Sequence, residues 1–201
     1  MQAPLVRAGI FGPPLHPLSQ ARRRDRRGAM TMLTETVFED DRWQAFGLED
    51  LAERAARAAL AHLGHVPEDH LISVLACDDA RIAALNTEFR GKPVPTNVLS
   101  WPSDERAAEE PGAEPEPPEP DPPEPDPTGG PLELGDIAIA YETCMSEAAA
   151  QGKDPAAHVT HLIVHAILHL LGYDHIHEAD AQLMEAHEVR ILAAMGLPDP
   201  Y

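Results

Sequence analysis

A short segment that is apolar on nearly all sides most constrains how this chain can fold. Residues 159–171 are mostly aliphatic, and a helix with this composition is normally buried. The histidines in and next to this segment fall at positions 158, 161, 165 and 169, in steps of three and four. They therefore form one stripe along a helix. Burying several imidazoles together is costly unless a partner satisfies them, and a metal ion is such a partner.

The spacing of three histidines resembles that of a catalytic zinc site. His165 and His169 lie one helical turn apart on one face, Gly172 allows the helix to end, and His175 follows three residues later. Three neutral nitrogen ligands leave a fourth position open to water, as in catalytic rather than structural zinc sites. We therefore expect one zinc ion per chain, held by His165, His169 and His175, which would lower the pKa of its water to roughly 7.

The neighbouring polar residues leave alternatives open. His161 is either an outer partner of the site or a residue of the helix entry, because a fourth histidine ligand would close the site. Asp174 either orients an imidazole N–H or is a turn residue. We expect His158 and His177 on the surface.

A zinc metalloprotease is the rival interpretation of this spacing. Proteases of the zincin type carry H-E-x-x-H, extended in one branch by a glycine and a third histidine. His165, His169, Gly172 and His175 are in register with that pattern, but Ala166 stands where the protease keeps its general-base glutamate. Peptide hydrolysis by that route lacks its proton acceptor.

The remainder of the folded part predicts an α/β or α+β domain, with about five helices on a small mixed sheet. No apolar run reaches the 18 residues of a membrane span, and two cysteines, Cys77 and Cys144, do not suggest a disulfide framework. We expect a cytoplasmic protein with two buried thiols. The expected helices cover residues 47–63, 78 or 79–89, 142–151, 155–171 and 179–195, and the expected strands cover 70–76, 96–101 and 134–140.

Charge is distributed very unevenly along the chain, whose formal net charge is −19. Residues 1–29 carry +5 and predict a disordered extension, with Met30 or Met32 as alternative starts. Residues 103–130 hold ten acids, nine prolines and one arginine, and predict a solvated acidic insert. It interrupts a single domain over residues 30–201, of which the rest carries −15. Such a charge argues against tight binding of phosphates.

A second informative stretch surrounds Arg90. This residue follows a predicted helix and precedes a Pro-containing loop that leads to Thr96-Asn97-Val98-Leu99-Ser100. A cation is electrostatically favourable at a helix C-terminus, which is one interpretation of Arg90. The other is a guanidinium that clamps phosphate oxygens near the metal.

These motifs together resemble the YbeY family of bacterial endoribonucleases and rRNA maturation factors. Residues 165–175, His-Ala-Ile-Leu-His-Leu-Leu-Gly-Tyr-Asp-His, are similar to that family's histidine signature, and the Arg90 stretch and Leu134-Gly135-Asp136-Ile137 are similar to its other two motifs. The resemblance covers roughly residues 33–102 and 131–201. It does not explain the acidic insert or the N-terminal extension.

The resemblance implies a zincin-like α/β fold, with zinc on His165, His169 and His175, and Arg90 as the arginine required for activity. It implies cleavage of single-stranded RNA, maturation of small-subunit (16S) ribosomal RNA and ribosome quality control. Partners would be ribosomal RNA and the small subunit, reached through a basic ribosomal protein, with no DNA and no membrane. A non-catalytic ribosome-assembly factor with structural zinc and a metalloprotease-like hydrolase stay open as alternatives.

Overall fold

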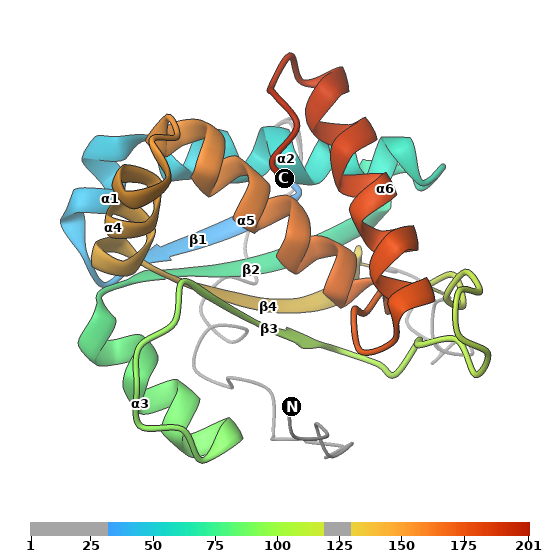
Figure 1. Cartoon of the computed structure of the whole chain (residues 1–201), viewed down its shortest axis with the longest axis horizontal. Coiled ribbons are helices and arrows are strands. Elements are labelled where there is room, and N and C mark those ends of the chain that lie inside the picture. The colour runs from blue at the N-terminus through green and yellow to red at the C-terminus, as the bar shows by residue number, and fades with distance from the viewer. Residues whose placement is uncertain (1–31, 119–129) are drawn as a thin grey trace.

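The computed structural model describes residues 32–118 and 130–201 (Figure 1). The expected N-terminal extension, the alternative start at Met30 and the last part of the expected insert lie outside these residues. The elements in chain order are β1 (Thr34–Phe38), α1 (Asp41–Phe46), α2 (Leu48–His62), the 3-10 helix η1 (Pro67–Asp69), β2 (His70–Cys77), α3 (Asp79–Arg90), β3 (Val98–Pro102), β4 (Leu132–Ala140), α4 (Tyr141–Gln151), α5 (Pro155–Leu170) and α6 (Glu178–Ala194).

The four strands form one mixed sheet in the order β1-β2-β4-β3. Strands β1, β2 and β4 are parallel, and β3 pairs with β4 in antiparallel register at the edge. The insert therefore joins two neighbouring strands. The expected mixed α/β fold is confirmed, with six α-helices in the described residues instead of about five.

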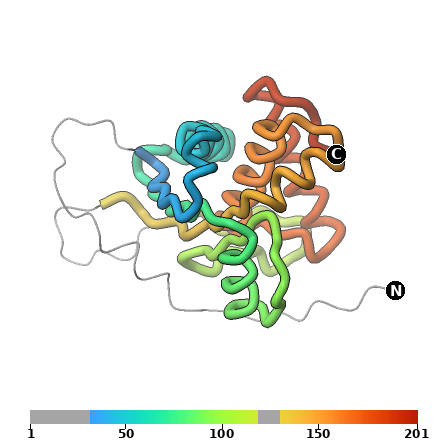
Figure 2. The backbone as a smooth tube through the Cα atoms, turned by 90° about the vertical axis from the view of Figure 1, so that its left-hand side faces the viewer, coloured from blue at the N-terminus to red at the C-terminus, as the bar shows by residue number. Residues whose placement is uncertain are grey.

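Helices cover the two faces of the sheet unequally. Alternate residues of β2 point to opposite faces, so that Ile72 and Val74 join the larger core, whereas Leu75 and Cys77 join a smaller one. The larger core contains the apolar sides of α2 and α5, and the smaller core contains Ile82 and other residues of α3. Among the described helices, α3 alone lies across the sheet from α2 and α5 (Figures 1 and 2).

Helix α5 has clear sequence signals at both ends. Asp154 accepts a hydrogen bond from the backbone N–H of Ala157 at 2.9 Å, and Pro155 occupies the first turn. Gly172, at φ +94°, lets the chain leave the helix in a left-handed conformation. Ten of its 16 residues are buried, as expected of a helix that is apolar on most sides.

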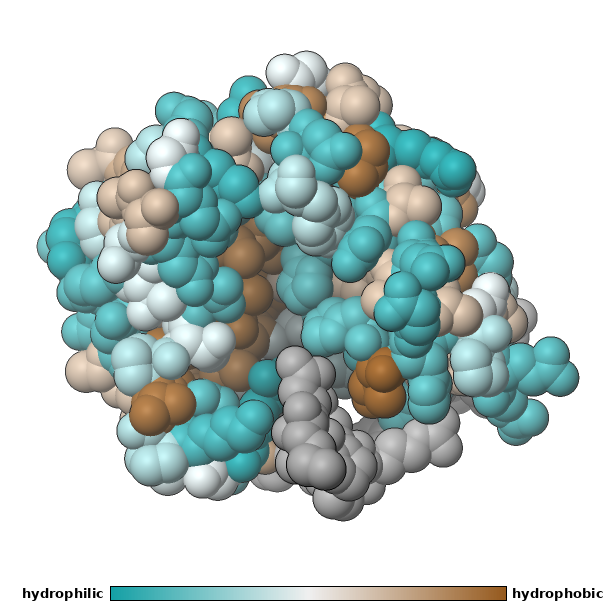
Figure 3. Space-filling view, viewed as in Figure 1, coloured by the Kyte–Doolittle hydropathy of each residue, from teal (hydrophilic) through white to brown (hydrophobic). Residues whose placement is uncertain are grey.

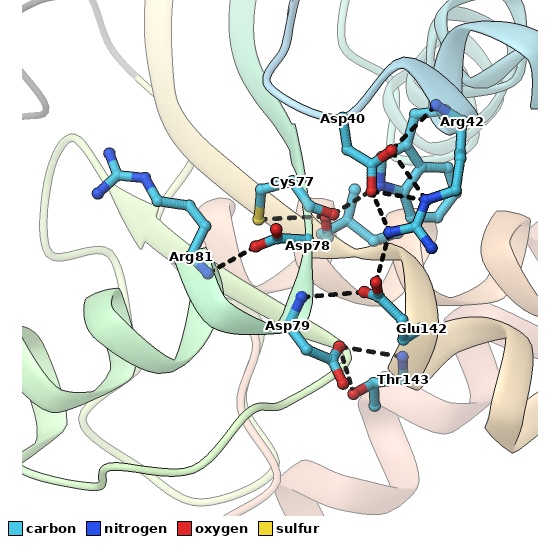
Figure 4. Close-up of polar contacts among 10 residues, drawn as sticks. Asp40, Arg42, Cys77, Asp78, Asp79, Arg81, Glu142 and Thr143 are labelled. Carbon is cyan, nitrogen blue, oxygen red and sulfur yellow. Dashed lines mark hydrogen bonds and ion pairs between the residues drawn. The ribbon is translucent and has the colours of Figure 1, made fainter.

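Polar side chains join several elements where the parallel strands end (Figure 4). Helices α3 and α4 cap each other: the Asp79 N–H donates to Glu142 at 3.0 Å, and the Thr143 N–H and hydroxyl donate to Asp79 at 3.1 and 2.8 Å. Arg42, in α1, forms ion pairs with Asp40 and Glu142. The network fixes the start of α3 to α1 and α4.

Part of the expected acidic insert contacts the domain. Residues 103–118 are described, and Arg106 within them is only 5% exposed. Its guanidinium donates to the carbonyl of Leu170 at 3.1 Å, so this side chain is not solvated. Both cysteines are buried, as expected. No helix in the described ranges has the length and apolar character needed to cross a membrane.

The surface is hollowed near the middle of the face seen in Figure 1, and apolar residues line one wall of this hollow (Figure 3).

Helix α5 packs over the edge strand β3 and over β4. The histidine stripe is therefore carried by an element that is buried in the core along most of its surface.

Candidate metal centre

The structure brings three of the predicted residues together. His165 and His169 project from α5, and His175 reaches back from the turn before α6. One potential ligand nitrogen of each histidine lies within 4.8 Å of the others. The ring centroids are 4.6 Å apart for His165 and His169, 5.5 Å for His165 and His175, and 5.1 Å for His169 and His175.

The protons of two of these rings are fixed by their outer partners. His169 Nδ1 lies 2.9 Å from the carbonyl oxygen of Tyr173, which only accepts, so this nitrogen carries the hydrogen. His165 Nδ1 lies 2.7 Å from Oε1 of Glu188, and an ionised carboxylate also only accepts. In the neutral form of both rings, the lone pairs are therefore on Nε2.

These two lone-pair nitrogens face one point. His165 Nε2 and His169 Nε2 are 3.1 Å apart, a separation at which two lone pairs repel unless a proton or a cation lies between them. An imidazole set with its other nitrogens held by a carboxylate and a carbonyl is the usual environment of a divalent metal. The three histidines therefore fit a zinc ion or a similar transition metal.

Burial keeps His169 ready to bind a cation at neutral pH. Desolvation, with further contributions from His165 and His175, lowers the pKa of His169 to about 3. Its imidazole therefore stays neutral at pH 7 and at pH values well below 7, and the neutral imidazole is the form that binds metal. His165 is 27% exposed through its side chain and His175 is exposed, so the site opens to solvent on one side.

Glu188 is a residue of the candidate site that the sequence did not predict. It is fully buried on α6 and accepts hydrogen bonds from His165, from His161 at 2.8 Å, and from the Tyr201 hydroxyl. Burial opposes ionisation of Glu188, but these hydrogen bonds outweigh it and lower the pKa to about 2. Nothing local distinguishes this glutamate from others on α6, so no signal in the sequence pointed to it.

The other histidines and Asp174 have different surroundings. His161 is hydrogen-bonded to Glu188, and its ring contacts that of His165 edge to face with the centroids 6.3 Å apart, which agrees with an outer position. The carboxylate of Asp174 accepts from the backbone N–H of His175 at 2.7 Å, as a turn residue does. His177 is exposed as expected. His158 is 5% exposed, and the prediction of a surface position was wrong because its ring packs toward α4 and pairs with Glu147 at 3.0 Å.

The Arg90 stretch lies on a different element. Arg90 is the last residue of α3, on the face of the sheet opposite α5, and its side chain is exposed. Within the described ranges it has no ion-pair partner. The preceding Phe89 contacts Trp101 of β3, with ring centroids 5.1 Å apart, which places the end of α3 beside the strand that α5 also contacts.

Two asparagines of this stretch have structural partners. Asn86 is 4% exposed and donates to the carbonyl of Val94 at 2.8 Å, which holds the loop after α3. Asn97 donates to Glu147 of α4 at 3.0 Å, and its own Oδ1 accepts from the Val98 N–H at 2.7 Å. These side chains therefore fix the loop and the start of β3.

Comparison with known proteins agrees with these features. The family described as Endoribonuclease YbeY matches residues 36–196. The chain is 61% identical over 172 residues to Endoribonuclease YbeY of Cereibacter sphaeroides, covering 86% of this chain and all of that one. It is 57% identical to the protein of the same name from Ruegeria pomeroyi, covering 85% and 98% of the two chains. A solution structure of a Thermotoga maritima protein has a TM-score of 0.48 and 19% identity, covering 81% of this chain and 91% of that chain. From the family match and these identities, the chain belongs to the YbeY family of endoribonucleases, which are hydrolases that act on RNA.

Proposed function

We propose that this protein is a zinc-dependent endoribonuclease that cleaves single-stranded RNA and acts in the cytoplasm in maturation of small-subunit (16S) ribosomal RNA and in ribosome quality control. The observation that carries the proposal is the convergence of three histidines within 4.8 Å in a chain of an endoribonuclease family. We infer a zincin-like arrangement, in which the helix with two ligands packs over the edge strand β3.

In this proposal His165, His169 and His175 hold the ion. Glu188 and the Tyr173 carbonyl orient two of the rings through their Nδ1 hydrogens. When bound, zinc supplies Lewis-acid chemistry, polarising a phosphate oxygen and making water acidic enough to react near neutral pH. The exposed side of the cluster, at His175, is where a phosphodiester would reach it.

Arg90 is proposed to bind a phosphate group of the RNA. Its guanidinium is exposed and, among the described residues, is not engaged in an ion pair. An arginine fork suits phosphate oxygens because it donates two parallel hydrogen bonds. In this role Arg90 would neutralise the charge that develops on the phosphate during cleavage.

The charge of the domain bears on how RNA is recruited. Outside residues 1–29 and 103–130 the chain carries a net charge of −15. Few phosphates could be neutralised by such a surface, so affinity for free RNA should be low and strongly dependent on salt. We propose that a basic ribosomal protein on the small subunit binds the acidic domain and brings the RNA to the metal.

Cleavage of defined RNAs tests the proposal. Wild-type protein, His169→Ala and Arg90→Ala are incubated with single-stranded, double-stranded and small-subunit ribosomal RNA, with metal analysis of each preparation. His177→Ala, which changes an exposed histidine outside the cluster, is the control. We expect about one zinc ion per chain in wild type and in Arg90→Ala, none in His169→Ala, and cleavage of single strands by wild type and the control only.

Other results would overturn parts of the proposal. Wild-type protein without zinc would remove the metal assignment. Cleavage that survives both His169→Ala and Arg90→Ala would remove the assignment of the active site. A protein that binds small subunits, holds zinc and cuts no RNA would instead be the non-catalytic assembly factor.

A further inference from the structure

Residues 103–118, here called the strap, contact the chain segment that carries the metal-site histidines. The strap follows β3 and lies beside the loop that joins α5 to α6, as the yellow-green segment of Figure 1. Arg106 is its only basic residue and is 5% exposed. The guanidinium donates to the Leu170 carbonyl at 3.1 Å, to Asp104 at 2.7 Å and to Ser103 Oγ at 3.2 Å. Leu170 is the residue directly after His169.

The strap backbone also packs directly on the turn that leads to His175. A Cβ added to Gly172 would lie 2.7 Å from the carbonyl carbon of Arg106 and 2.8 Å from its oxygen. Real Cβ atoms essentially never show such contacts with backbone, so the two segments fit only because residue 172 has no side chain. The Arg106 carbonyl accepts from the Glu116 N–H at 3.0 Å, which closes the strap on itself.

Two further contacts hold the strap against the loop before α6 and against α6 itself. The Tyr173 hydroxyl donates to Glu114 of the strap, while the Tyr173 carbonyl accepts from His169 Nδ1. On the other side, the Gly112 N–H donates to Asp180 in the first turn of α6 at 2.6 Å. One residue, Tyr173, thus joins the strap to a candidate ligand.

We propose that the strap is a structural part of the metal centre and that Arg106 is a positioning residue, which acts on His169 and His175 through Leu170, Gly172 and Tyr173. This inference rests on the metal site proposed above. It assigns a role to the first half of the acidic insert, which sequence alone gave no reason to connect with the histidines. An ordered loop makes metal binding more favourable, because the third ligand, His175, is already held in place before the ion binds.

Electrostatics separates this role from a charge effect. Removing the positive charge of Arg106 makes the surroundings more negative, and by Coulomb's law this should strengthen binding of a cation. Loss of positioning should weaken it. The sign of the change in zinc affinity therefore distinguishes the two effects.

Zinc affinity of full-length variants tests the proposal. Dissociation constants are measured by competition with a chromophoric chelator for wild type, Arg106→Ala, Arg106→Lys and Tyr173→Phe. Glu109→Gln, which alters an exposed strap residue, is the control. Absorption spectra of the cobalt-substituted proteins report the geometry of the site, and circular dichroism of the zinc-free proteins reports folding.

We expect about tenfold weaker zinc binding for Arg106→Ala and Tyr173→Phe, at the lower end of the range for outer partners of metal ligands. Arg106→Lys should recover part of the loss because it keeps a donor for the Leu170 carbonyl. The cobalt spectrum of Arg106→Ala should change, whereas the control should match wild type. Unchanged or tighter zinc binding by a folded Arg106→Ala, with wild type binding zinc, would overturn the role of the strap alone. A wild-type protein that binds no zinc would overturn the metal site itself, and the strap inference with it.

Discussion

His165 Nδ1 and Glu188 Oε1 lie 2.7 Å apart, and the carboxylate of Glu188 is fully buried. A buried carboxylate needs hydrogen-bond donors, and Glu188 receives them from two histidines and Tyr201. The contact also fixes the ring orientation of His165, so that Nε2 faces His169. A residue of α6 thereby controls the direction of a candidate ligand on α5.

Replacing Glu188 by Gln should weaken zinc binding by about 10- to 100-fold, because an amide orients the His165 ring less strongly and does not raise its basicity. The measurement is the zinc dissociation constant by chelator competition. Glu185→Gln removes an exposed carboxylate from the same helix and should leave the constant unchanged. Equal loss in both variants would point to a general charge effect.

The ionised form of Glu188 should stabilise the zinc-free protein. Its pKa is held at about 2, against 4.5 for an unperturbed glutamate, and each pKa unit corresponds to about 1.4 kcal/mol. The contribution is therefore about 3 kcal/mol above pH 4.5 and disappears as the pH falls toward 2. Denaturant unfolding of wild type and Glu188→Gln across this range should show a difference that narrows with acidification. A difference independent of pH would contradict the prediction.

Removing metal should lower stability only where the histidine set is intact. Zinc that binds only the folded state adds about 2.7 kcal/mol to the free energy of unfolding when its free concentration is 100 times the dissociation constant. A chelator should therefore lower the thermal midpoint of wild type and leave that of His169→Ala unchanged. A chelator-dependent shift of similar size in His169→Ala would mean that the metal binds elsewhere.

Asp79→Ala should cost about 1 kcal/mol, the usual effect of losing a helix cap. Asp79 accepts from both the N–H and the hydroxyl of Thr143, so its removal leaves the start of α4 uncapped. Urea unfolding measures the change, and Glu88→Ala on the exposed side of α3 is the control. Zinc affinity should be the same in both variants, because the contacts of Asp79 in this network are with Glu142 and Thr143 and not with the histidines of the cluster.

Gly135→Ala should be one of the most damaging single changes, at about 3 kcal/mol or more. The residue has φ +138°, and an added Cβ would lie 2.1 Å from the Trp101 carbonyl oxygen on β3. The strands would have to separate to accommodate it. Gly130→Ala, where an added Cβ meets nothing within 4 Å, is the matched control, and thermal unfolding should show little change for it.

The long elements were predictable because each has a strong local pattern. Helix α5 combines a capping aspartate, a first-turn proline and an apolar stretch, and the strand at 70–76 is a short run of apolar and β-branched residues. Strand β1 and helix α1, with five and six residues, have only weak local patterns, and they depend on contacts such as Trp43 Nε1 donating to the Cys77 carbonyl. Such contacts exist only in the folded chain.

Some residues of the candidate site could likewise be predicted from the sequence, and others could not. Three histidines could be grouped from spacing, because two lie on one helix and the third follows a turn marked by glycine. Glu188 and Arg106 could not, because they reach the site from α6 and from an acidic low-complexity segment through tertiary packing. Sequence spacing identifies groups that share an element, whereas partners from other elements require the fold.

The antiparallel pairing of β3 with β4 has a consequence for how this protein can vary. Pro102 pairs with Gly135, and the Ser103 N–H donates to the Leu134 carbonyl at 2.9 Å, so the two ends of the connection are clamped together by the sheet. Once a loop is closed, each doubling of its length costs only about 0.6 kcal/mol. The connection between the strap and β4 can therefore change in length at little cost in folding free energy, because its two ends stay held by the β3–β4 pairing.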